Sequence, residues 1–253
     1  MVAFTFVGIL SLIGLYRMDA FKIIEHNTPE SCRALIMDGS AEDIEIDYER
    51  GYAYLSIQDR AALIRGEMVQ GRIVKINLNK KPYEITSALN EQPEHLRPHG
   101  ISLHIDDKGK RHLAVINHPK DRGLEPENVD LFSEENNGIF KYTKTISDPL
   151  FKSPNDLLLV SKNQFYVGND KGGETSLDKI QENLGRPMSN IAYFDGNSTS
   201  VAASNLSQVS GINISKDQNL IFASETTAKR ISVFHRNADT GELKKIHRIK
   251  LDG

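Results

Sequence analysis

The sequence predicts an all-β protein, namely a β-propeller built from four-stranded blades. The first observation behind this prediction is that, after Cys32, short alternating apolar runs are broken by turn residues, which is typical of β-hairpins. The second is a repeat. Four hairpins begin near Glu42, His99, Asn155 and Ser210, at successive spacings of 57, 56 and 55 residues. A constant repeat of this length indicates a repeat architecture, and it has room for four antiparallel strands.

Each repeat opens with an apolar strand, a polar turn and a second apolar strand. In chain order these hairpins read DIEIDYERGYAYLSI, GISLHIDDKGKRHLAVIN, NDLLLVSKNQFYVGN and GINISKDQNLIFASE. Further strand pairs lie between them, such as NVDLFSEENNGIFKYTKTI and NIAYFDGNSTSVAA, and one helix is expected near residues 176–184. A β-sandwich also has many short strands, but it has no reason to keep a constant spacing.

The number of repeats leaves the closure of the propeller open. Fewer than four complete units fit between Glu42 and Gly253, whereas propellers close with about four to eight blades. Either four blades close in an unusual way, or the sequence is the front portion of a longer protein. We therefore expect a partial propeller domain over residues 21–253, with about four blades.

The first 20 residues form a separate hydrophobic segment. An apolar run from Val2 to Tyr16 is too short for the ~20 residues of a membrane-spanning helix and suits an export signal or an uncleaved anchor. No Lys or Arg precedes it and no clear A-x-A cleavage site follows, so an ordinary buried helix is the alternative. We expect an exported or membrane-anchored protein, with association to a membrane or lipid surface through this segment.

Charge and cysteine content exclude several classes of partner and site. A net charge of −3 and scattered Lys and Arg residues argue against nucleic-acid binding. One cysteine, Cys32, can form neither an internal disulfide nor a thiolate zinc site. The sequence also lacks G-x-S-x-G and H-E-x-x-H, which disfavours serine and zinc hydrolases.

Polar residues gather where the repeats begin. The first strand of each blade lines the central channel of a propeller, so residues about one repeat apart become neighbours at one mouth of that channel. The side chains that meet there are rich in oxygen: Glu42, Asp43, His99, Asn155, Asp156 and Ser210. A single Asn-Asp pair is more simply explained as a turn cap, but several in register favour a hard cation such as Ca²⁺.

Six segments together resemble the paraoxonase/arylesterase family of calcium-dependent lactonases, six-bladed propellers related to the gluconolactonase group. They are AEDIEI, PHGISL, VINHP, SPNDLLLV, QFYVGND and GINIS, and they occur in the family's order from about Cys32 onwards. The resemblance implies a calcium-dependent hydrolase that acts on small aryl esters and lactones.

The resemblance also implies two calcium ions, one catalytic and one structural. Glu42 and Asn155 match ligands of the catalytic ion, whereas Asp43, Asp156 and the backbone carbonyl of Ile101 match ligands of the structural ion.

Two histidines match the base dyad that is proposed for the family. His99 in PHG would activate water, and His118 in NHP would orient His99 or the water. His95, His104 and His112 have no matching context, and we expect them at the surface.

Ser210 marks a departure from the family, because members have an Asn ligand of the catalytic calcium at this place. A further Asp-Asn pair of ligands would fall just beyond Gly253, so the resemblance is to a C-terminally truncated member. A catalytically inactive propeller or binding module is therefore the alternative function.

Overall fold

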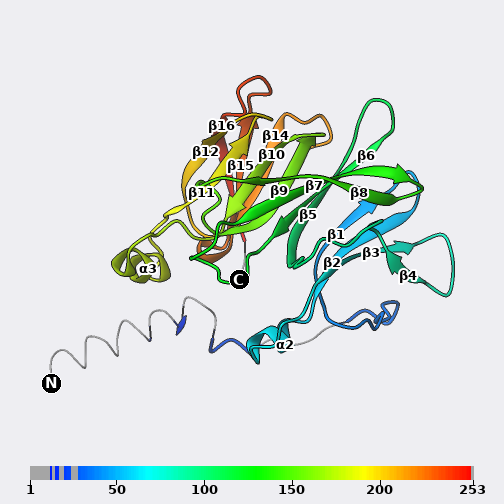
Figure 1. Ribbon diagram of the computed structural model, residues 1–253. Helices are drawn as coiled ribbons and strands as arrows, with labels where there is room; N and C mark the ends of the chain where they lie inside the picture. The colour runs from blue at the N-terminus through cyan, green and yellow to red at the C-terminus, as the bar shows by residue number, and fades with distance from the viewer. Residues whose placement is uncertain (1–11, 13–14, 17–19, 24–27, 252–253) are drawn as a thin grey trace.

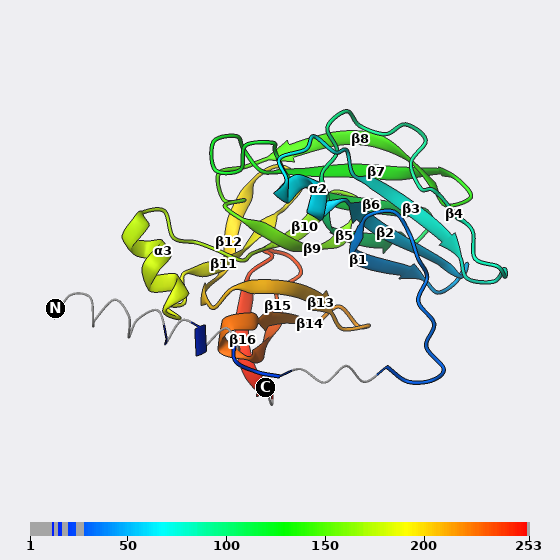
Figure 2. The same cartoon turned by 90° about the horizontal axis from the view of Figure 1, so that it is seen from below.

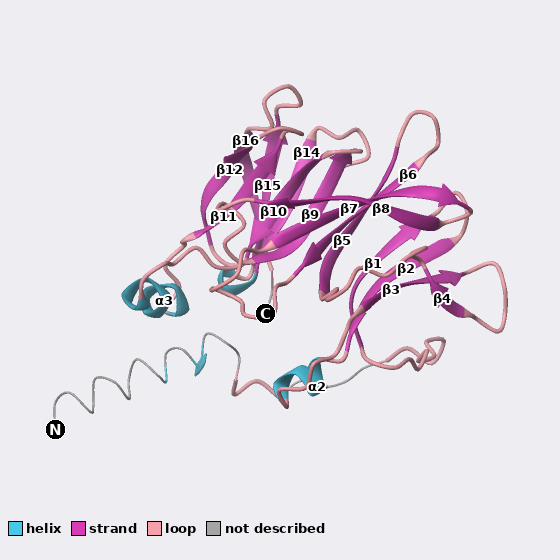
Figure 3. Ribbon diagram, in the orientation of Figure 1, coloured by secondary structure: helices cyan, strands magenta, loops and turns pink. Residues whose placement is uncertain are grey.

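The structure is a computed structural model that describes residues 12, 15–16, 20–23 and 28–251. It confirms the all-β prediction, because four antiparallel sheets of four strands each form four propeller blades (Figures 1 and 3). In each sheet the strands follow one another in sequence order, so every blade is one continuous stretch of chain. The constant repeat of the sequence corresponds to this construction.

The blades have these bounds. The first contains β1 (Ser40–Asp47), β2 (Tyr52–Gln58), β3 (Arg72–Asn77) and β4 (Ile85–Ser87). The second contains β5 (Pro98–Ile105), β6 (Arg111–Asn117), β7 (Asn128–Asn136) and β8 (Ile139–Ser147). The third contains β9 (Pro154–Ser161), β10 (Gln164–Asn169), β11 (Ser189–Phe194) and β12 (Thr199–Leu206). The fourth contains β13 (Val209–Ile214), β14 (Leu220–Glu225), β15 (Arg230–Arg236) and β16 (Leu243–Lys250).

Helices are few and lie in the loops between strands. The predicted helix is present as α3 (Ser176–Asn183), and it begins at Thr175, whose side chain and that of Asp178 form a capping box. A short helix, α2 (Arg60–Ile64), follows β2, and a 3₁₀ turn, η1 (Thr226–Ala228), follows β14. None of these helices contributes to the sheets, so the strands carry the fold.

The hydrophobic core lies between neighbouring blades. Leu157 and Leu159 of β9 alternate with side chains that face the other side of the sheet, and they pack with Ala114 and Ile116 of β6. This period of two explains why the hairpins read as alternating apolar runs. Apolar burial between sheets therefore holds the blades together.

The innermost strands also exchange hydrogen bonds from one blade to the next, although they belong to separate sheets. β1, β5, β9 and β13 pack in this order (Figure 2). A β1 carboxylate, Asp43 Oδ2, accepts the N–H of Ile101 in β5 at 2.8 Å. The Ser102 hydroxyl in β5 accepts the N–H of Leu159 at 2.9 Å, and Asp156 Oδ2 in β9 accepts the N–H of Ile212 in β13 at 2.8 Å. These bonds fix the strand ends where the predicted site residues lie.

Two sequence predictions have different outcomes. His112 was expected at the surface but is buried, because its Nε2 lies 3.1 Å from Asp106 Oδ2 in the β5–β6 turn and its polar edge is thereby satisfied. The prediction of an N-terminal export or anchor segment over residues 1–20 falls almost wholly outside the described residues. Within the part of the chain that the structure describes, no helix is long and apolar enough to cross a membrane.

Candidate functional site

The predicted site residues lie at the beginnings of the innermost strands, as the repeat predicted. Glu42 and Asp43 are in β1, His99 and Ile101 in β5, Asn155 and Asp156 in β9, and Ser210 in β13. His118 follows the end of β6, which pairs with β5 and therefore brings it back to the same edge. Four separate segments of the sequence thus meet at one end of the blades.

His99 is the best connected of these residues. Its Nδ1 lies 2.7 Å from the carbonyl oxygen of Asn155, and its Nε2 lies 3.1 Å from Glu42 Oε1. A carbonyl can only accept, so Nδ1 carries the proton and Nε2 is the nitrogen that can take another. Burial and the nearby charge of His118 lower the pKa of His99, although Glu42 opposes this shift.

His118 lies against His99 and is held by a carboxylate that the sequence reasoning missed. The two imidazole rings meet edge to face with centroids 4.9 Å apart. His118 Nδ1 lies 2.6 Å from Glu127 Oε2, and Arg122 Nε donates to Glu127 Oε1 at 2.8 Å. His118 Nε2 is buried and has no hydrogen-bond partner.

Glu127 precedes β7, which pairs with β6, and this adjacency was the available signal. Burial alone would raise the pKa of Glu127, but the hydrogen bond from His118 and the charge of Arg122 produce a net lowering. A carboxylate that stays ionised fixes the proton of His118 on Nδ1, as an orienting group does in hydrolase sites.

Glu42 is shared between two basic groups. Its Oε1 faces His99, and its Oε2 forms an ion pair with Arg60 in α2 at 2.5 Å. The loop after β2 therefore supplies a cation to the site that the sequence reasoning did not foresee. Any metal ion at Glu42 would have to share its carboxylate with Arg60.

Three carboxylates next to Glu42 have raised pKa values. Burial, together with the charge of Asp43, raises the pKa of Asp156 to about 7, and burial with the charges of Asp43 and Asp156 raises that of Glu45 to about 8. Burial also raises the pKa of Asp43, although backbone N–H groups of Ile101 and Ile44 oppose it. Negative charge is therefore concentrated here without an equal amount of positive charge.

Asn155 and Ser210 are less closely joined to the others. The carbonyl of Asn155 reaches His99, but the Ser210 hydroxyl bonds to the hydroxyl groups of Thr226 and Ser224. The structure thus brings together Glu42, His99, Asn155 and His118, whereas Ser210 makes its own contacts within the fourth blade.

The donor set was also considered as a metal site. Among the described residues, no group of three or more His, Cys, Asp or Glu side chains is arranged to hold a metal ion. The remaining donor types are those that Ca²⁺ uses, namely carboxylates, a carboxamide, a backbone carbonyl and a hydroxyl. Space around Asp156 is kept by Gly100, because a Cβ there would lie 2.7 Å from the Asn155 carbonyl oxygen and 3.0 Å from Asp156 Oδ1. In chemistry, though not in complete geometry, the residues suit calcium.

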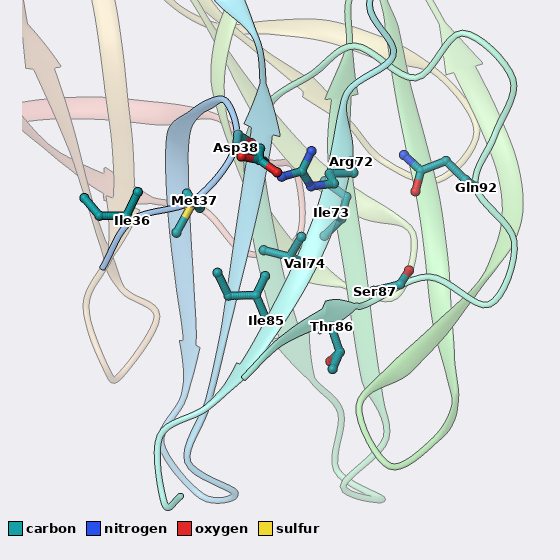
Figure 4. A pocket seen from close by; sticks show the side chains of 10 residues that line it. All are labelled: Ile36, Met37, Asp38, Arg72, Ile73, Val74, Ile85, Thr86, Ser87 and Gln92. Carbon is teal, nitrogen blue, oxygen red and sulfur yellow. Dashed lines mark hydrogen bonds between the residues drawn. The ribbon is translucent and has the colours of Figure 1, made fainter. Parts of the chain in front are cut away.

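Two cavities differ in what they offer. One of about 630 Å³ is lined by His118 and adjoins the histidine pair. Another of about 420 Å³ lies between β3, β4 and residues 36–38, and Figure 4 shows Ile73, Val74 and Ile85 along its wall. Arg72 donates to the carbonyl of Asp38 at 2.5 Å in that second cavity, which contains none of the predicted site residues. The cavity beside His118 is therefore the candidate substrate site.

Comparison with known proteins gives one consistent group. The arylesterase family pattern matches residues 25–253. Serum paraoxonase/lactonase 3 of Homo sapiens is 29% identical over 257 residues, which cover 97% of this chain and 71% of that protein. Serum paraoxonase/arylesterase 2 of Bos taurus is 28% identical over 237 residues, which cover 90% of this chain and 66% of that protein.

Among solved structures, a putative 6-phosphogluconolactonase from Bacteroides uniformis has a TM-score of 0.55 at 17% identity. It matches 84% of this chain, and the chain spans 55% of that protein's length. A protein of unknown function from Desulfotomaculum acetoxidans has a TM-score of 0.54 at 11% identity, with 87% of this chain and 59% of that protein covered. At these identities the structural likeness concerns the fold alone.

Proposed function

Because the chain belongs to the arylesterase family, we propose that it is a calcium-dependent hydrolase of aryl esters and lactones. The observation that carries the proposal is the setting of His99. Its Nδ1 donates to the Asn155 carbonyl at 2.7 Å, which leaves Nε2 at the strand entrance as a base. The names of the relatives, which include lactonase and arylesterase, support this substrate class.

In the proposed reaction, His99 Nε2 takes a proton from a water molecule as the water oxygen bonds to the ester carbonyl carbon. The bond between that carbon and the leaving oxygen then breaks, and the leaving oxygen receives the proton, so an acid and an alcohol result. Glu127 holds His118 through Nδ1, and His118 packs on the His99 ring and keeps it in place. A neutral His99 is available near pH 7, because its pKa is lowered by burial and by His118.

Calcium, when bound, would polarise the carbonyl and stabilise the negative charge that develops on its oxygen. Glu42 and Asn155 are the proposed ligands of a catalytic ion, and Asp43, Asp156 and the Ile101 carbonyl those of a structural ion. Asp43 and Asp156 already stand close enough to raise each other's proton affinity, which supports a cation between neighbouring strand entrances. Ser210 is the proposed weak ligand of the catalytic ion.

The test is hydrolysis of phenyl acetate and of a γ-lactone by the 253-residue chain, with calcium and with a chelator. We expect activity only with calcium, and His99→Gln should lower kcat by about 10²- to 10⁴-fold while calcium binding is retained. His235→Gln, an exposed histidine of β15, is the matched control. Equal activity of His99→Gln and wild type would remove His99 from the mechanism.

A second candidate, a non-catalytic propeller or binding module, is favoured by one observation. Glu42 is engaged by Arg60, and Ser210 is engaged by Thr226, so two proposed ligands already have partners. This candidate predicts no turnover at saturating calcium, even in Ser210→Asn. Measurable turnover in wild type or in Ser210→Asn would reject it.

Location and partners remain proposals as well. The matching relatives are named as serum proteins. We propose export for this chain too, with possible attachment to a lipid surface through residues 1–20. Fractionation of cells that express the full chain tests this, since recovery in the cytosolic fraction contradicts it.

A further inference from the structure

The cavity beside His118 has a basic residue at its floor. Arg97 lines the cavity of about 630 Å³ together with His118, and only 8% of each residue is exposed. The backbone joins them directly, because the carbonyl of Arg97 accepts the N–H of His118 at 3.1 Å. The N–H of Arg97 donates to the side chain of Asn117 at 2.8 Å. Arg97 is thus fixed at the side of the candidate histidine pair.

The guanidinium of Arg97 has no carboxylate partner among the residues that the structure describes. Its Nη2 lies 3.6 Å from the sulfur of Met68, a weak acceptor. Other buried arginines are better satisfied. Arg111 pairs with Asp47 and Glu49, and Arg236 reaches the Tyr166 hydroxyl and the Gln218 carbonyl. A buried charge without a partner is costly, so Arg97 is a charge that lacks its counter-ion.

The rest of the cavity shows where a counter-ion would enter. Glu94 and Glu125 also line it, but both are exposed residues of the rim, and Glu94 lies 3.6 Å from His95. Their charges are screened by water, as is that of Lys120 on the same rim. An anion at the floor would instead meet Arg97 and the unpaired Nε2 of His118, away from bulk water. Guanidinium binds carboxylate through two parallel hydrogen bonds.

We propose that Arg97 binds a carboxylate group carried by the substrate at a position remote from the bond that is cleaved. The favoured substrates are then anionic lactones or esters, and Arg97 is a specificity-determining residue. This inference rests on the proposed function, because hydrolysis at His99 is what makes the neighbouring cavity a substrate site.

The test compares two γ-lactones of nearly equal shape, 5-oxotetrahydrofuran-2-carboxylate and its neutral carboxamide, with wild type, Arg97→Gln and Arg97→Lys. We expect wild type to prefer the carboxylate, and Arg97→Gln to lower kcat/KM for it at least about tenfold, with the carboxamide changed less than about twofold. Arg97→Lys should recover part of the loss. Arg186→Gln, which removes one charge near α3, is the control.

A second measurement does not depend on turnover. Titration calorimetry with glutarate should show binding to wild type that weakens at least about tenfold in Arg97→Gln and not in Arg186→Gln. If glutarate binds in this way but neither lactone is cleaved, the anion site stands and the proposed function fails. If folded Arg97→Gln binds glutarate as wild type does, or loses activity equally on both lactones, the proposed role of Arg97 is overturned.

Discussion

Strand β1 carries acidic residues at both of its ends, and the two ends differ in how their charge is balanced. At the far end Asp47 is fully buried, yet the hydrogen bonds and charge of Arg111 outweigh the effect of burial and lower its pKa. At the entrance end, burial raises the pKa values of Asp43 and Glu45, and no arginine compensates. The far end is complete as a structural contact, whereas the entrance end is prepared for a cation. The same residue types therefore serve stability or binding according to their neighbours.

The largest effect should come from breaking the complete end. Arg111→Met leaves Asp47 buried without its partner, and we expect the free energy of unfolding to fall by about 3–5 kcal/mol in urea titrations. Arg65→Met is the matched control, because the Arg65–Glu67 pair is exposed and should matter by less than about 1 kcal/mol. Similar losses in the two variants would contradict this account of the Asp47 contact.

The entrance end should respond to calcium. In chelated protein, calcium at about one hundred times its dissociation constant should raise the free energy of unfolding by about 2.7 kcal/mol. Asp156→Ala should lose this response, because it removes a carboxylate that the entrance shares between two blades. Asp217→Ala, in an exposed turn, should keep it. A full calcium response in Asp156→Ala would separate the cation from this group of carboxylates.

The smallest effect is a pH dependence confined to the entrance end. The pKa of Glu45 lies at about 8 in the folded chain and near 4.5 when unfolded, so its contribution to stability weakens as pH rises between these values. In the presence of a chelator, Glu45→Gln should gain stability relative to wild type as pH increases from 5 to 8, by at most about 1.4 kcal/mol per pH unit.

For Asp47 the sign is opposite. Its lowered pKa gives stability that is present above about pH 4 and is lost only as pH falls through the folded value. Unfolding free energies measured at several pH values check both statements, with the exposed Glu67→Gln as control. A difference between Glu45→Gln and wild type that does not change from pH 5 to 8 would contradict the raised pKa.

The fold was predictable because its regularities are local and periodic. A spacing of 55 to 57 residues between hairpins was enough to bring Glu42, His99 and Asn155 to one edge, since identical blades repeat the same path. The ligand roles of these residues came from the family resemblance and not from the spacing. They stay predictions.

What could not be predicted depends on loops outside the repeat. Arg60, Arg97 and Glu127 reach the site from segments whose sequences carry no period, so nothing in the pattern connects them to the histidines. His112 was wrong for a related reason. A polar residue in an alternating strand suggests exposure, and only the fold shows that Asp106 satisfies it.

The bonds between innermost strands have a consequence for how the blades separate. Because each blade is a contiguous piece of chain, it can detach from its neighbour without breaking its own sheet. The amides of Ile101, Leu159 and Ile212 are each protected by a side chain of the preceding blade. Their hydrogen-exchange rates should follow the opening of the interfaces between blades rather than the opening of the sheets, so these three amides report separately on the three joints of the propeller.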